Sequence, residues 1–310
     1  MRTRFIYVQL AAWAAAVALL NIAIATLAAN SLPRQLLRAI AQSSHVTDLF
    51  AGNSVMVAAI DAAAFEQARP GTRALNVALG STSPVEHALF VHRALELHPQ
   101  RVYYGFFDSQ LTRAAPSRWR DLTGTRAMVY YVDRERAIQL MGADGPPAWQ
   151  VRLTSLLPMA VERATLWAGV ERTRRKLAAF GATPQAAGRF GRAADFSALE
   201  GDPDLFRRYC ADVVARRTPL LPAVRDLFDA VRSAGAALIV IEAPMPASHR
   251  RRFYDTSEWY AYRAYLESEI ERYGGRFVDA SGWMADDQFE DVVHVKPQAA
   301  AAFSARLARL

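Results

Sequence analysis

The segment Val46-Thr47-Asp48-Leu49-Phe50-Ala51-Gly52-Asn53-Ser54 decides the fold that we expect for this chain. Residues 46–51 are mostly apolar and few in number, which is typical of a buried strand, and the glycine after them marks a tight turn. We expect a helix to follow over residues 55–65. A strand, a turn and a helix in this order place Ser54 at the carboxyl end of a strand.

Four more strand-like runs follow along the chain, at residues 73–79, 101–107, 236–241 and 276–279. Helical segments separate them, and one begins with a typical capping box, Ser83-Pro84-Val85-Glu86. Near-continuous apolar strands that alternate with helices favour a parallel sheet covered on both faces. We therefore predict an α/β fold with a doubly wound, flavodoxin-like sheet of five parallel strands.

The part of the chain from residue 109 to 220 does not follow this alternation. It contains turn-rich segments and one long helical stretch over residues 153–180. We predict that residues 46–310 form one α/β domain, that residues 109–220 are a helical insertion in it, and that residues 31–45 are a linker.

The N-terminus contains a candidate membrane span. Arg2 and Arg4 precede an uncharged, mostly apolar run over residues 5–29, and about 20 apolar residues suffice to cross a bilayer. Basic residues before a span favour a cytoplasmic N-terminus. We predict that residues 1–30 are a single-pass anchor in the inner (cytoplasmic) membrane, with the main domain on the periplasmic side. A cleaved signal peptide is the alternative, and the length of the run favours a retained anchor.

Composition limits the classes of partner. The 310 residues are 52% hydrophobic and 22% charged, which indicates a chain that buries a substantial core. The net charge is +7, but the arginines are scattered and no zinc-finger or RNA-binding motif accompanies them, so nucleic acid is not expected as a partner. The single Cys210 forms no internal disulfide. His87 and His92 do not share a helical face, and we expect neither a metal nor a cofactor.

Ser54 and two residues near the end of the chain form a candidate catalytic triad. Ser54 follows a glycine turn, and Asp291-Val292-Val293-His294 lies near the end of the chain. A serine becomes nucleophilic when an imidazole takes its proton, and the imidazole needs a carboxylate to set its tautomer. Ser54, Gly80 and Asp108 all follow strands, and sites in parallel sheets gather at that edge. Taken singly, Ser54 also fits a helix N-cap, and Asp291 and His294 also fit an i,i+3 helix pair.

These motifs, in the order in which they occur along the chain, resemble those of the SGNH/GDSL hydrolase superfamily. The Gly-Asp-Ser block of that family corresponds to Gly52-Asn53-Ser54, its second-block glycine to Gly80, and its Asp-x-x-His block to residues 291–294. The resemblance covers roughly residues 44–110 and 235–310. It implies that Ser54, Asp291 and His294 are catalytic, and that the backbone N–H groups of Ser54 and Gly80 form the oxyanion hole.

One block departs from the family pattern. The family has Gly-x-Asn-Asp, with the asparagine donating to the oxyanion, whereas this chain has Gly105-Phe106-Phe107-Asp108. Loss of one such donor costs roughly 10²–10³ in turnover. An N-terminal span before an external SGNH-like domain also resembles the accessory proteins of alginate O-acetylation and of teichoic-acid D-alanylation.

The resemblance implies a serine esterase or O-acyltransferase that acts on an extracytoplasmic polysaccharide or envelope polymer through an acyl-Ser54 intermediate. A membrane-bound O-acyltransferase is then a candidate partner. The alternative is a non-catalytic SGNH-like envelope protein that binds a polymer or a polysaccharide-modifying membrane complex. The sequence leaves open the acyl group and whether water or a sugar hydroxyl accepts it.

Overall fold

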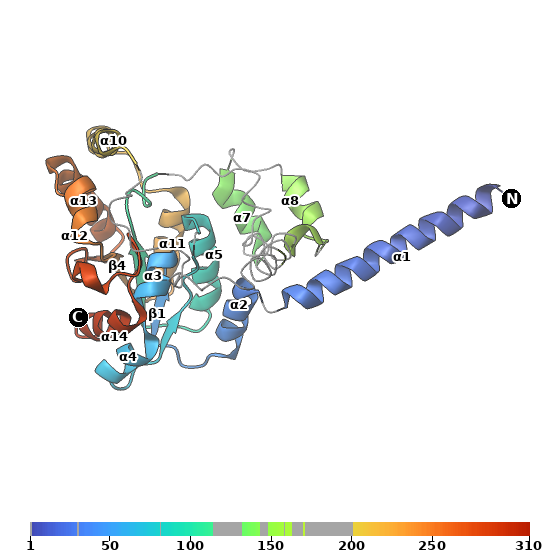
Figure 1. Cartoon of the computed structure of the whole chain (residues 1–310), viewed down its shortest axis with the longest axis horizontal. Coiled ribbons are helices and arrows are strands. Elements are labelled where there is room, and N and C mark those ends of the chain that lie inside the picture. The colour runs from blue at the N-terminus through green and yellow to red at the C-terminus, as the bar shows by residue number, and fades with distance from the viewer. Residues whose placement is uncertain are drawn as a thin grey trace, which may run out of the picture. The chain divides into compact units, whose positions relative to one another are not determined.

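The computed structural model describes residues 2–29, 31–80, 82–113, 132–142, 148–157, 159–162, 170 and 201–310. The chain divides into two compact units. The first unit contains Met1–Ala41 and Pro116–Thr183, and the second contains Gln42–Ala115 and Pro184–Leu310. The predicted insertion at residues 109–220 lies partly outside the described residues, and so does most of the predicted helical stretch over residues 153–180. Elements are labelled as in Figure 1.

A five-stranded parallel sheet forms the centre of the second unit, as the sequence predicts. Its spatial order is β2-β1-β3-β4-β5, which is the flavodoxin-like order, and every neighbouring pair is parallel. The strands are β1 (Asp48–Ala51), β2 (Ala74–Asn76), β3 (Arg101–Phe106), β4 (Ala237–Glu242) and β5 (Arg276–Asp279). All five therefore present their carboxyl ends at one edge of the sheet.

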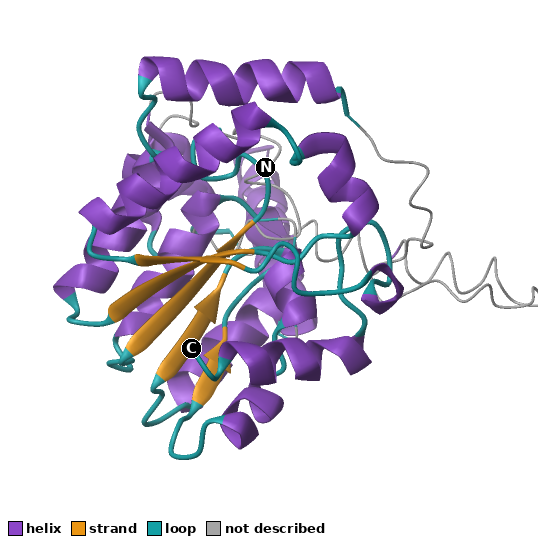
Figure 2. Cartoon of the chain, turned by 90° about the vertical axis from the view of Figure 1, so that its left-hand side faces the viewer, coloured by secondary structure: helices purple, strands orange, loops and turns teal. Residues whose placement is uncertain are grey.

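Helices cover both faces of this sheet, as Figure 2 shows. Side chains on one face, among them Phe50 and Tyr103, form a buried cluster with α3, α4 and α14. On the other face Tyr104 contacts Phe228 of α11, with ring centroids 6.0 Å apart. The strands are buried on both sides, which explains why they are nearly continuous apolar runs. These helices are α3 (Ser54–Ala59), α4 (Ala62–Ala68), α11 (Pro222–Ser233) and α14 (Pro297–Leu307), and the same unit contains α5 (Pro84–Leu95).

Four more helical elements lie in the C-terminal half of the second unit. They are α10 (Pro203–Arg216), α12 (Ala247–Phe253), α13 (Ser257–Arg272) and the 3-10 helix η3 (Asp286–Gln288). Trp259 of α13 packs on Phe206 of α10, with centroids 5.6 Å apart. Aromatic packing therefore holds α10 and α13 together.

The prediction of a single helix over residues 55–65 is wrong, because the helix is interrupted between α3 and α4. Ile60 is extended, with φ −100° and ψ 117°, and the Asp61 carboxylate caps α4 by accepting from the N–H of Ala64 at 3.0 Å. The Asp61 N–H donates to Ser304 Oγ of α14 at 2.8 Å. A contact with a helix some 240 residues away in sequence thus stabilises the break.

The first unit contains α1 (Arg2–Ala28), α2 (Leu32–Gln42), α7 (Arg134–Met141) and α8 (Ala148–Thr154). Within α1, Phe5–Leu27 is long and apolar enough to cross a membrane. The length of this helix agrees with the predicted anchor. Its orientation and its retention in the mature protein stay predictions.

Candidate active site

Two glycines bring the start of α3 close against the sheet. Gly52 has φ +142°, and a Cβ there would lie 2.6 Å from the Gly105 carbonyl oxygen. A Cβ at Gly105 would lie 2.0 Å from the Met56 sulfur. Only residues without a side chain fit at these two positions. The turn therefore places Ser54 at the carboxyl end of β1.

Ser54 is the first residue of α3 and does not cap it. The cap is Asn53, whose Oδ1 accepts a hydrogen bond from the N–H of Val55 at 3.0 Å. The N-cap interpretation of Ser54 is therefore wrong, and the serine hydroxyl is available for another role.

The structure brings the three predicted triad residues together. The Ser54 hydroxyl lies 2.8 Å from His294 Nε2. His294 Nδ1 lies 2.7 Å from Oδ2 of Asp291 and 3.0 Å from its Oδ1. Ser54 and His294 are 240 residues apart in sequence, so only the fold makes this contact. These distances are those of a serine, a base and the carboxylate that orients the base.

A loop carries Asp291 and His294, so the helix-pair interpretation is wrong. An antiparallel bridge between Phe289 and Val295 closes this loop, and the Glu290 N–H donates to the His294 carbonyl at 2.7 Å. Asp291 Oδ1 also accepts from the N–H of Val293 at 2.9 Å and from the N–H of His294 at 2.8 Å. These two backbone hydrogen bonds hold the Asp291 carboxylate in its position beside the imidazole.

The surroundings of Asp291 favour its ionised form. Burial raises the pKa of this carboxyl, but hydrogen bonds from the His294 ring and from the N–H groups of Val293 and His294 outweigh burial and leave the pKa below its ordinary value. An ionised Asp291 keeps the proton of a neutral imidazole on Nδ1. Nε2 is then an acceptor that faces the Ser54 hydroxyl.

Gly80 lies beside Ser54, as the predicted oxyanion hole requires. A Cβ at Gly80 would lie 3.4 Å from Ser54 Cβ and 3.9 Å from Ser54 Cα. The preceding N–H, that of Leu79, donates to the Gly52 carbonyl at 3.1 Å and ties this segment to the serine turn. The two backbone segments expected to bind an oxyanion are therefore adjacent.

Gln110 is a residue that sequence reasoning missed. Its Oε1 accepts from Asn53 Nδ2 at 3.1 Å. Asn53 Oδ1 already accepts from the Val55 N–H, so the group of Asn53 that faces Gln110 is the Nδ2 amide, which can only donate. The acceptor on Gln110 is therefore its Oε1. Gln110 Nε2 then makes no hydrogen bond with any residue that the structure describes. No motif or spacing marks this glutamine in the sequence.

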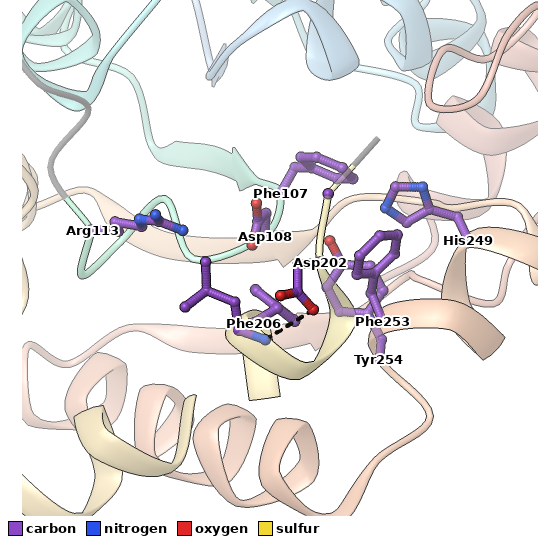
Figure 3. Close-up of a pocket in the computed structure, with 10 residues that line it drawn as sticks. Phe107, Asp108, Arg113, Asp202, Phe206, His249, Phe253 and Tyr254 are labelled. Atoms are coloured by element: carbon purple, nitrogen blue, oxygen red, sulfur yellow. Dashed lines mark hydrogen bonds between the residues drawn. The ribbon is translucent and has the colours of Figure 1, made fainter. Parts of the chain in front are cut away.

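Phe107 lines a cavity of about 320 Å³, whose walls combine aromatic side chains with the charged side chains of Asp108, Arg113 and Asp202 (Figure 3). Its ring centroid is 5.5 Å from that of His249 and 6.4 Å from that of Tyr254. Burial lowers the pKa of His249 to about 4, so this ring is neutral near pH 7. Asp108 also lines the cavity and accepts from the Ser109 N–H at 2.5 Å.

The comparisons with known proteins leave the chain without an assigned family. No protein family matches it, and no curated protein is similar to it. Within the described ranges, no group of three or more His, Cys, Asp or Glu side chains is placed to bind a metal ion. The structure thus defines an α/β domain with a hydrogen-bonded Ser54–His294–Asp291 chain at the carboxyl edge of a parallel sheet.

Proposed function

We propose that this protein is an SGNH-like serine esterase or O-acyltransferase that works through an acyl-Ser54 intermediate. The observation that carries the proposal is the continuous chain of hydrogen bonds from the Ser54 hydroxyl through His294 to Asp291. It is supported by the position of these residues at the edge of the sheet where sites of such folds lie.

The triad geometry supports the following reaction in this proposal. Ser54 Oγ attacks the carbonyl carbon of an ester while His294 Nε2 takes the hydroxyl proton. Ionised Asp291 stabilises the imidazolium that forms, and the N–H groups of Ser54 and Gly80 receive the oxyanion. When the tetrahedral intermediate collapses, His294 gives its proton to the leaving alkoxide and the acyl group stays on Ser54. Water or a sugar hydroxyl then attacks the acyl-enzyme while His294 takes its proton. The bond from the acyl carbon to Ser54 Oγ breaks, and His294 returns the proton to Ser54 Oγ, which restores the free serine.

Gln110 supplies the third donor to the oxyanion in this proposal. Phe107 stands where the family has asparagine, and its ring packs against His249 and Tyr254. The Asn53–Gln110 hydrogen bond holds a side-chain amide beside the serine turn with its N–H₂ end available. In this proposal the side-chain amide that the family takes from its asparagine comes instead from Gln110, three residues after Phe107.

The substrate we propose is an O-acylated polysaccharide or envelope polymer outside the cytoplasm. The apolar segment Phe5–Leu27 and the basic residues before it support a single-pass protein of the inner membrane with its main domain in the periplasm. In this arrangement a membrane-bound O-acyltransferase is the candidate partner.

A second function has one observation in its favour. The phenylalanine at position 107 removes a donor that family members use, which also fits a non-catalytic envelope protein that binds a polymer or a membrane complex.

A fluorophosphonate probe separates the two functions. Wild-type protein should form a covalent adduct on Ser54, the Ser54→Ala variant should form none, and a Ser268→Ala variant should react like wild type. Ser268 is an exposed serine of α13 and serves as the matched control. Mass spectrometry of the labelled peptide identifies the site. Absence of an adduct on folded wild-type protein would reject the enzyme and leave the binding protein.

A further inference from the structure

An exposed apolar face follows residues 149–157 of the first unit. Trp149, Leu153, Leu156 and Leu157 are 64%, 54%, 69% and 40% exposed, whereas Val151 is fully buried at 0%. The four exposed residues are spaced i, i+4, i+7 and i+8, which places them on one side of a helical turn. Backbone hydrogen bonds from the N–H groups of residues 155 and 157 continue the turn beyond the end of α8. Apolar side chains grouped in this way mark an interaction surface.

The chain just beyond this face contacts α1. The Met159 N–H donates to Asn21 Oδ1 at 3.0 Å, and Asn21 Nδ2 donates to the Val17 carbonyl at 2.8 Å. Asn21 lies within the apolar segment Phe5–Leu27, where a side-chain amide needs partners because hydrocarbon offers none. It precedes Leu27 by six residues, about 9 Å along the helix axis.

The contact covers one stripe of α1 near its C-terminal end. Asn21, Ile24 and Ala28 are the buried positions there, at the i, i+3 and i+7 spacing of one helix face. Val161 is buried as well, and Glu162 pairs with Arg34 of α2 at 2.7 Å. Residues 159–162 are therefore packed against the C-terminal end of α1 and against α2. These are the parts of the first unit that would lie in the membrane and just outside it.

We infer that residues 149–157 form a lipid-facing element, whose apolar face enters the bilayer leaflet on the C-terminal side of α1. The inference rests on α1 crossing a membrane, as proposed above. The bilayer is the occupant because Met159, two residues beyond Leu157, is bonded to a position inside the apolar span. Leu20 and Leu27 of α1 are exposed apolar residues as well. A tryptophan at the start of such a face is typical of a membrane interface.

The test uses the full chain in phosphatidylcholine–phosphatidylglycerol vesicles, with a fluorescent NBD group on one introduced cysteine. The test position is Leu156→Cys, and Trp13→Cys in the middle of α1 reports whether the anchor itself is inserted. Ala264→Cys, an exposed position of α13, is the control in the second unit. The native Cys210 is buried, and labelling of the unmodified chain measures its background.

Lipids that carry doxyl quenchers along their acyl chains, at both shallow and deep positions, then report contact with the bilayer. We expect quenching at position 156 that approaches the value at position 13 and exceeds the value at position 264 by about twofold or more. Quenching at 13 without quenching at 156 would overturn the inference and leave the anchor intact. No quenching at 13 would reject the anchor, and with it the inference. Equal quenching at 156 and 264 would show that no particular segment enters the lipid, which also overturns it.

Discussion

Replacing Asp291 with asparagine should reverse the hydrogen-bond direction in the triad. Asp291 Oδ1 accepts from two backbone N–H groups, those of Val293 and His294, so the oxygen of an asparagine must occupy that position. The new NH₂ group then takes the place of Oδ2, which lies 2.7 Å from His294 Nδ1. Because NH₂ only donates, Nδ1 must accept, and the ring proton moves to Nε2. Nε2–H then faces Ser54 and takes no proton from it.

The expected loss is large although the variant keeps its fold. Forcing the wrong tautomer in a serine–histidine–aspartate site lowers turnover by about 10⁴, which corresponds to about 5.4 kcal/mol in the activation free energy. Asparagine is nearly isosteric and retains the two backbone hydrogen bonds. We therefore expect the midpoint of chemical unfolding to stay close to that of wild type. The loss should be smaller than that of Ser54→Ala, since the orienting carboxylate is often the least critical member of a triad.

The assay is the second-order rate of fluorophosphonate labelling at pH 7.5, read together with unfolding in urea. Asp226→Asn is the matched control. Asp226 pairs with His92 at 2.7 Å, so this substitution changes a similar carboxylate–imidazole pair elsewhere in the second unit. The control should label at the wild-type rate. A folded Asp291→Asn protein that also labels at the wild-type rate would refute the tautomer argument.

Three further predictions concern single residues. Gln110→Ala should slow labelling of Ser54 by roughly 10²-fold with little change in stability, because the variant lacks the oxyanion donor proposed above. An unchanged rate would reject this role of Gln110. Burial raises the pKa of Glu242 to about 7, so the folded state favours the neutral acid and loses stability as the pH rises from about 4.5 to about 7. The free energy of unfolding of Glu242→Gln should therefore gain about 2 kcal/mol relative to wild type between pH 5 and pH 8, and a pH-independent difference would contradict this. Gly105→Ala should destabilise the fold by about 3 kcal/mol, because the new methyl group meets the Met56 sulfur, and Met56→Ala should restore part of the loss in a double-mutant cycle.

Local patterns in the sequence are enough to predict the sheet. Each strand is a short apolar run that ends at glycine or a polar residue, and helix signals separate the runs, so strand number and parallel pairing follow from neighbours along the chain. The range 276–279 predicted for the last strand is the range of β5. The single helix predicted over residues 55–65 is wrong, and one interaction that stabilises the break, the hydrogen bond from the Asp61 N–H to Ser304 Oγ, joins residues far apart in the sequence.

The candidate site also has some features that the sequence shows and others that only the folded structure decides. A glycine before Ser54, a glycine at position 80 and the Asp291-x-x-His294 spacing are visible in the sequence and identify what can react. Whether these groups meet depends on β1, which carries the serine turn, and on the loop that the Phe289–Val295 bridge closes. The orientation of Gln110 depends on a chain of side-chain hydrogen bonds across the sheet edge. Sequence determines such features when their cause lies within a few residues, whereas contacts over some 240 residues are decided only when the chain has folded.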